Sequence, residues 1–106
     1  MKRSIIAAVA CLTLAAPAFA DSAADTYKAK CKSCHGEDGA GKTKTGEKEK
    51  IADMSDPAWQ KKHTDEDIKT VISEGSKDNK KMKPFKDKLS AEEIDGLVKY
   101  IRTLKK

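Results

Sequence analysis

The chain is poor in the large side chains from which small proteins usually build a core. Aromatic residues make up 5% of its 106 residues, and 37% of the residues are charged. A small domain buries only about 60% of the surface that its unfolded chain exposes, and it commonly needs an additional stabilising element. The composition therefore predicts that something other than side chains fills part of the interior.

Cysteine and long apolar runs are also scarce. Beyond residue 20 the chain has only Cys31 and Cys34, and a disulfide between them would close too small a loop to stabilise the fold much. The longest apolar run, 5–16, is shorter than the roughly 20 residues that a transmembrane helix needs. We therefore expect neither a disulfide-stabilised domain nor a transmembrane segment.

Residues 1–20 are typical of a secretory signal peptide. Two basic residues at positions 2 and 3 precede the apolar run, and residues 18–20 read AFA, an A-x-A cleavage site. We expect a periplasmic domain over residues 21–106, and loss of the leader lowers the formal net charge from +5 to +3. A lipid-attachment site at Cys11 is the less favoured alternative, because the residues before it lack the usual leucine.

The remaining chain shows helical patterns and no alternation of period two, so one all-α domain is expected. Polar loops rich in glycine or lysine separate the helices. The predicted helices cover 23–33, a short segment from Pro57, 64–75 and 90–104, and the loops cover 36–50 and 77–88.

The last two predicted helices have the clearest start signals and apolar faces. Thr64 with Asp67 and Ser90 with Glu93 form capping boxes. The apolar residues at helical spacing, whose faces we expect to be buried, are Ile68, Val71, Ile72, Ile94, Leu97, Val98, Ile101 and Leu104.

The segment CKSCHG at residues 31–36 carries the strongest chemical signal. On a helix, Cys31, Cys34 and His35 project from the same side. Two thiols can each add across a vinyl group of haem and the adjoining imidazole can bind the iron, which is the C-x-x-C-H pattern of c-type haem attachment. A planar apolar ring also accounts for the missing core, so the chain without haem is expected to be largely unfolded.

Two other interpretations of the cysteines are weaker. A thioredoxin-like redox dithiol belongs beside a βαβ pattern, which the sequence lacks. A structural zinc ion needs four ligands, and beyond the two cysteines only His35 and the distant His63 are available.

The chain resembles the small bacterial class I cytochromes c over essentially all of residues 21–106. The resemblance is carried by the leader, by the segment CKSCHGEDGAGK, by the loop segment KMKPF and by the terminal amphipathic helix. The resemblance implies a small class I helical fold around one haem c, bound covalently through two thioethers to Cys31 and Cys34. It also implies His35 and Met82 as the iron ligands, because the family takes its sixth ligand from a methionine shortly before the last helix.

The surroundings of Met82 also favour ligation. It lies between lysines in a polar loop where no apolar pattern explains it, and a thioether is a soft ligand that raises the reduction potential of haem iron. The alternatives are a core role for Met82, Met54 as the ligand, and bis-histidine ligation through His63. We expect Met54 to pack beside the haem and His63 to lie on the surface.

Several single residues also match positions of the cytochrome c family. Tyr27 resembles the aromatic residue of the first helix, and Leu97 with Tyr100 resembles the pair on the last helix against which it packs. Trp59 is a candidate for haem binding, since its indole N–H could donate to a propionate, although core packing explains it equally well. Many relatives of mitochondrial type orient the imidazole with a proline carbonyl; residues 36–51 contain no proline, so the acceptor is not assigned.

A haem iron bound by histidine and methionine has no open position for a substrate. The resemblance therefore implies electron transfer between redox proteins rather than enzyme activity, by a domain that we expect to be a monomer. The alternative is a haem-based sensor or enzyme in which the Met82 bond is weak and the iron binds peroxide, carbon monoxide or nitric oxide.

Lysines around Met82 predict a docking surface for an acidic redox partner. They are Lys77, Lys80, Lys81, Lys83, Lys86 and Lys88, and they are offset only by Asp78 and Asp87. Nucleic acid is not expected as a partner, because the charges of an exported chain are mixed.

Overall fold

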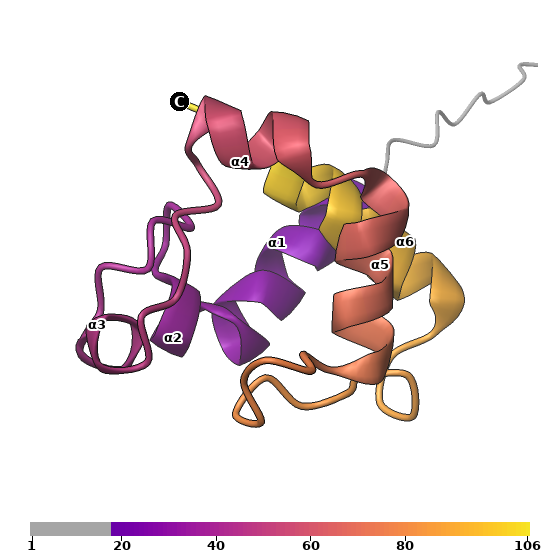
Figure 1. Cartoon of the computed structure of the whole chain (residues 1–106). Helices are drawn as coiled ribbons and strands as arrows, with labels where there is room; N and C mark the ends of the chain where they lie inside the picture. Colours follow the sequence, from indigo (N-terminus) through magenta and orange to yellow (C-terminus); the bar gives the residue numbers. More distant parts are fainter. Residues whose placement is uncertain (1–17) are drawn as a thin grey trace, which may run out of the picture.

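A computed structural model describes residues 18–106, with side chains from Ser22 onward, and this part of the chain contains helices and no strand (Figure 1). The helices are α1 (Ala18–Lys30), α2 (Lys32–His35), α3 (Lys44–Lys48), α4 (Pro57–Lys62), α5 (Asp65–Glu74) and α6 (Ala91–Arg102). The all-α prediction is confirmed. The predicted leader lies mostly in residues 1–17, outside the described residues. Within the described range, no helix combines the length and the apolar character needed to cross a membrane.

The fold is organised around the packing of α1 on α6, and α5 packs on α6 as well. Tyr27 on α1 and Leu97 on α6 are each 1% exposed. The ring centroids of Tyr27 and Tyr100 lie 5.1 Å apart in a tilted arrangement. The predicted contact between the first and last helices is therefore present.

The buried apolar residues form one cluster at this packing site. Its members are Tyr27, Met54, Ile68, Ile72, Leu89, Ile94, Leu97, Val98 and Ile101. The prediction for α5 was wrong at Val71, which is 39% exposed. Helix α5 buries Ile68 and Ile72, and Val71 lies beside that face rather than on it. Leu104 lies beyond the end of α6 and is half-buried.

Local capping explains where the later helices begin. The side chain of Asp56 accepts a hydrogen bond from Ala58 N at 2.9 Å, and Pro57 occupies the first turn of α4. Both predicted capping boxes are formed, at the starts of α5 and α6. Gly75 ends α5 with a positive φ of 85°, a conformation that glycine adopts without strain.

The segment around the C-x-x-C-H motif differs from the prediction in two ways. The single helix predicted over 23–33 is interrupted at Cys31, and α2 continues to His35. The polar segment 36–50 was expected to be a loop only, but it contains α3. Helix α3 begins where Thr43 Oγ1 accepts a hydrogen bond from Gly46 N at 2.8 Å.

Gly46 explains why α3 can lie against the motif. A Cβ atom at this position would collide with the carbonyl oxygens of Gly41 and Cys34. Only glycine allows this close approach of one backbone to another. The glycine that suggested a turn in the sequence is therefore a packing residue inside a short helix.

Candidate functional site

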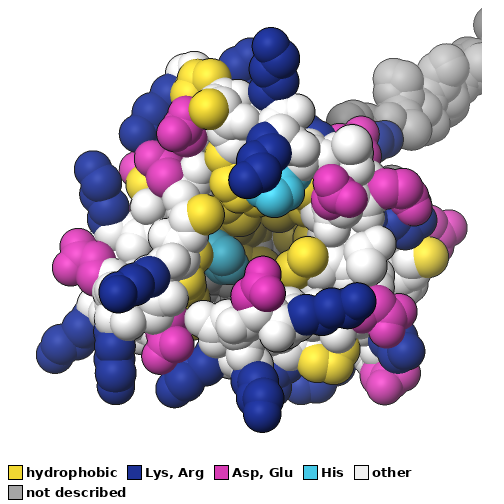
Figure 2. Space-filling model, viewed as in Figure 1, with side chains coloured by type: hydrophobic (Ala, Val, Ile, Leu, Met, Phe, Trp, Pro, Cys, Tyr) yellow, Lys and Arg dark blue, Asp and Glu magenta, His cyan; other side chains and the backbone are white. Residues whose placement is uncertain are grey.

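Figure 2 shows a hollow in the middle of one face of the molecule, with apolar side chains at its floor and histidine side chains at its wall. In the same view, Figure 1 places α1 and α2, α4, α5 and the loop 75–89 around this position. The chain has two histidines, His35 and His63. A concave apolar site with a few polar groups is typical of cofactor binding.

The motif occupies one helical turn. His35 N donates to Cys31 O at 2.9 Å, and Cys34 N donates to the same oxygen at 3.2 Å. All three side chains are half-buried, both cysteines are free thiols, and Cys31 packs against the apolar cluster. Cys31, Cys34 and His35 therefore lie on one turn, and their convergence on one haem stays a prediction.

Burial gives His35 the properties of a metal ligand. It lowers the pKa of the imidazole, so the neutral form, which binds metals, is favoured. His35 Nδ1 is buried and has no hydrogen-bond partner among the described residues. Two thiols and a neutral imidazole beside an apolar hollow fit the attachment of haem c.

The competing interpretations of the cysteines gain no support. Burial, followed by repulsion from Cys34, raises the pKa of the Cys31 thiol to about 11. A redox dithiol needs the opposite, a lowered pKa that produces thiolate at neutral pH. Among the residues that the structure describes, no group of three His, Cys, Asp or Glu side chains could hold a metal ion such as zinc.

Met82 lies on the loop 75–89, which the fold holds in place. Its side chain is half-buried and packs against the apolar cluster. Met82 N donates to Asn79 O and Ser76 N donates to Met82 O, each at 3.1 Å. The loop is joined to α5 where Phe85 N donates to Ile72 O at 2.9 Å.

Glu49, just after α3, connects this loop to the segment that follows the motif. Its carboxylate accepts from Asn79 Nδ2 at 3.4 Å and lies 3.7 Å from Lys81 Nζ.

Met54 differs from Met82 because its side chain belongs to the apolar cluster itself and is 7% exposed. Met54 thus packs in the apolar cluster, and its expected place beside the haem stays a prediction.

Trp59 and His63 lie together at the end of α4. Their ring centroids are 4.8 Å apart, and Trp59 packs against the apolar cluster. The Trp59 indole N–H donates to none of the described residues. His63 is half-buried and so partly at the surface, and the expectation that it does not bind the iron stays a prediction. Its ring packs against Trp59 at an interplanar angle of 40°, and its backbone carbonyl accepts a hydrogen bond from Arg102.

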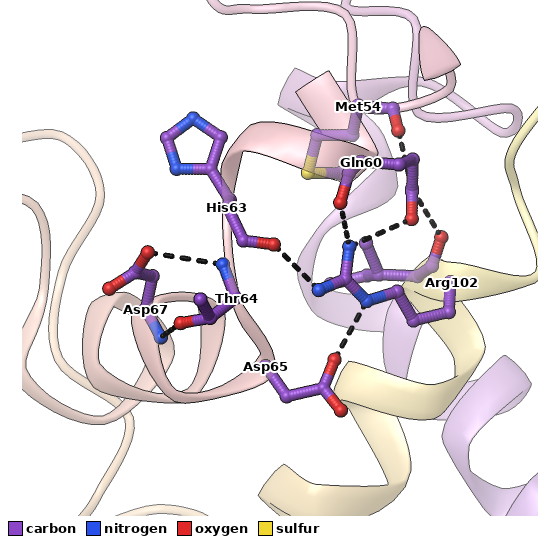
Figure 3. A network of polar contacts seen from close by, with 8 residues as sticks. Met54, Gln60, His63, Thr64, Asp65, Asp67 and Arg102 are labelled. Carbon is purple, nitrogen blue, oxygen red and sulfur yellow. Dashed lines mark hydrogen bonds and ion pairs between the residues drawn. The ribbon is translucent and has the colours of Figure 1, made fainter. Parts of the chain in front are cut away.

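The contacts of Arg102 were not predicted from the sequence (Figure 3). The guanidinium donates to Gln60 O at 2.7 Å, to Gln60 Oε1 at 3.0 Å and to His63 O at 2.6 Å. Gln60 is 8% exposed, and its Nε2 donates to Met54 O at 2.6 Å. A basic residue in the last turn of a helix is common, so no sequence signal distinguished Arg102.

Comparisons with known proteins agree with this site. The family model described as "Cytochrome C oxidase, cbb3-type, subunit III" matches residues 18–101. The chain belongs to the cytochrome c family. Among solved structures, the KustC0563 c-type cytochrome is 40% identical with a TM-score of 0.72, over 79% of this chain and 98% of that one. A tyrosine-to-phenylalanine variant of Kustc0563 is 38% identical with a TM-score of 0.69, over 78% and 98%.

No curated protein matched the chain. The family match confirms the resemblance to small class I cytochromes c that the motif, the loop and the last helix indicated. The family is defined by covalently bound haem c and generally carries electrons. This cytochrome c is therefore an electron-carrying haem protein.

Proposed function

We propose that this cytochrome c is an exported carrier of single electrons between redox proteins, with one haem. Cys31 and Cys34 hold the haem through two thioethers, and His35 and Met82 bind its iron. The observation that supports this proposal is the half-buried C-x-x-C-H turn beside an apolar hollow. When bound, the haem supplies an iron that gains and loses one electron.

The chain's own residues bind the ring and exclude water. The apolar floor of the hollow provides a dry surface, and burial keeps the His35 imidazole neutral and ready to ligate. The backbone hydrogen bonds of the loop 75–89 restrict the movement of Met82. An iron held by both His35 and Met82 would have no position open for a substrate and would supply electron transfer only. The Trp59 indole N–H has no acceptor among the described residues, and we assign it to a haem propionate.

The lysines around Met82 divide into paired and unpaired groups. Lys81 lies 3.7 Å from Glu49, and Lys86 lies 3.2 Å from Glu74. The exposed lysines that form no ion pair with a described residue are Lys77, Lys80, Lys83 and Lys88. Unpaired surface charge of one sign attracts a partner of the other sign, so we propose a redox partner with an acidic docking surface.

Absorption spectra of the oxidised and reduced protein, together with the mass of the intact exported chain, test the proposal. We expect the spectrum of a low-spin c-type haem and the mass of residues 21–106 plus one haem. This result also places the protein in the periplasm, because it requires removal of the leader. A colourless, folded protein at the mass of the polypeptide would contradict the proposal.

Carbon monoxide distinguishes the electron carrier from the sensor or enzyme that the sequence left open. The reduced carrier is expected to bind carbon monoxide slowly or not at all at neutral pH, since Met82 occupies the sixth position. Rapid binding would favour a labile Met82 and a gas- or peroxide-binding role.

A further inference from the structure

The end of the C-x-x-C-H turn is held through three consecutive backbone carbonyl groups. Cys34 O accepts from Thr43 Oγ1 at 2.7 Å, His35 O accepts from Gly41 N at 2.7 Å, and Gly36 O accepts from Tyr27 Oη at 2.8 Å. The last carbonyl groups of a helix have no partner within the helix. Donors from α1 and from the segment after the motif thus provide hydrogen bonds to the carbonyl groups at the end of α2.

The His35 ring is bound differently from its backbone. Its Nδ1 is buried and has no partner among the described residues, whereas its carbonyl oxygen is hydrogen-bonded. Metal-binding histidines almost always donate the second ring N–H to an acceptor, which fixes the orientation of the ring. In this chain the backbone of the turn has to supply that orientation.

We propose that Thr43 and Tyr27 are positioning residues that orient the His35 imidazole through the backbone of its own turn, an inference that rests on the proposed haem ligation. The Thr43 hydroxyl donates to Cys34 O and accepts from Gly46 N at 2.8 Å, so it connects the turn to the start of α3. Tyr27 is 1% exposed and packs between α1 and α6, so its hydroxyl connects the turn to the main helix packing.

The test uses the ferric holoprotein. Thr43→Val and Tyr27→Phe keep the shape of the side chain and remove the hydroxyl group. Haem-methyl hyperfine shifts in the proton NMR spectrum depend on the orientation of the axial imidazole, so they report the position of the His35 ring. The midpoint potential and the denaturant concentration at half-unfolding are measured on the same samples.

We expect each variant to change the pattern of haem-methyl shifts and the midpoint potential, with the largest change in the double variant. Thr43→Ser keeps the hydroxyl and is expected to restore the wild-type pattern. Thr103→Val is the matched control, because the Thr103 hydroxyl donates to Tyr100 O at the end of α6 and to no carbonyl group of the motif. This control is expected to keep the wild-type pattern.

The inference is overturned if Thr43→Val and Tyr27→Phe shift only the unfolding midpoint and leave the haem-methyl pattern and the potential as in the wild type. The two hydroxyl groups would then be structural only. If Thr43→Val yields no holoprotein, Tyr27→Phe decides alone. Absence of covalent haem in the wild type would instead contradict the proposed function, and it would be seen before any variant is compared.

Discussion

At the scale of single residues, the two methionines of the described chain have different environments. Met54 belongs to the apolar cluster and is 7% exposed, while Met82 is half-buried on a loop next to exposed lysines. A buried methionine fills space, whereas a thioether on a polar loop is available to a metal.

We therefore expect the ferric sulfur-to-iron charge-transfer band to disappear in Met82→Ala and to survive in Met54→Ala. The opposite result would assign the ligand to Met54.

Asp53 links the segment before α4 to the end of the chain. Its carboxylate accepts from the Ser55 hydroxyl, from Ser55 N at 2.9 Å and from Lys106 Nζ at 3.2 Å. The hydrogen bond from the Ser55 hydroxyl has the largest effect and lowers the pKa of the Asp53 carboxyl. Burial opposes it, and the Ser55 backbone and Lys106 lower the pKa further, so the net shift is downward. The ionised carboxylate thus stabilises the folded protein.

The sign of the pH dependence follows from the lowered pKa. The stabilisation is present above the unfolded-state pKa of about 4 and is lost as the pH falls through the lower folded-state pKa. Asp53→Asn should therefore melt at a lower temperature than the wild type near neutral pH, and the difference should shrink in acid. Thermal unfolding across this range measures it, with Asp87→Asn on the exposed loop as the control. A difference that is independent of pH would show that the charge of Asp53 is not involved.

At the scale of the elements, Arg102 joins the end of α6 to the corner between α4 and α5. Its guanidinium binds Gln60 and the carbonyl of His63, and it also pairs with Asp65 at 2.7 Å. The Asp65 side chain is 74% exposed. An exposed ion pair contributes less than about 1 kcal/mol, so the carbonyl contacts are the larger part of this junction.

Arg102→Met is expected to lower the free energy of unfolding by about 2 kcal/mol, because it leaves Gln60 and a backbone carbonyl without a donor. Asp65→Asn, the matched control, removes only the exposed partner and should lower it by less than about 1 kcal/mol. Urea denaturation of the holoprotein measures both. Equal losses in the two variants would mean that the ion pair, not the carbonyl contacts, stabilises the junction.

The elements that could be predicted are those with short-range signals. The capping boxes at Thr64 and Ser90 involve residues three positions apart, and both are formed. Helix α3 depends on the fit of Gly46 against Cys34 O, a contact between separate segments. The hydrogen bond from Arg102 to the carbonyl oxygen of His63 likewise joins residues 39 positions apart. Patterns along the sequence do not encode such long-range contacts, so these two features were missed.

The candidate haem site shows the same difference between short-range patterns, which could be predicted, and long-range contacts, which could not. The C-x-x-C-H turn is local, and the spacing of Cys31, Cys34 and His35 was enough to predict that they share one side. The carbonyl partners of the turn come from Tyr27 and Thr43, which carry no motif of their own. Sequence patterns thus indicated which residues form the candidate site, and only the folded chain could indicate which residues hold its backbone in place.

At the scale of the whole molecule, the hollow in Figure 2 has an apolar floor that water would cover in the absence of a haem. Exposing apolar surface is unfavourable by about 25 cal/mol per Å², and small domains have little stability in reserve. We expect the double variant Cys31→Ala, Cys34→Ala to lose the cooperative thermal transition of the wild-type holoprotein in far-ultraviolet circular dichroism. A native-like melt of this variant would show that the side chains alone form a sufficient core.

The charge distribution leads to a test of docking on the intact holoprotein. Lys80 and Lys83 are near Met82 in the sequence, are exposed and form no ion pair with a described residue. The double variant Lys80→Glu, Lys83→Glu therefore reverses two charges without breaking an ion pair of the described residues. With an acidic redox protein, we expect stopped-flow electron transfer to slow by about tenfold or more at low ionic strength. The difference between the variant and wild-type rates should disappear as salt shortens the screening length from about 30 Å at 0.01 M to about 3 Å at 1 M. Lys99→Glu, Lys105→Glu, two reversals on and just beyond α6, makes the same change in net charge and serves as the control. A wild-type rate that does not depend on salt would rule out electrostatic steering.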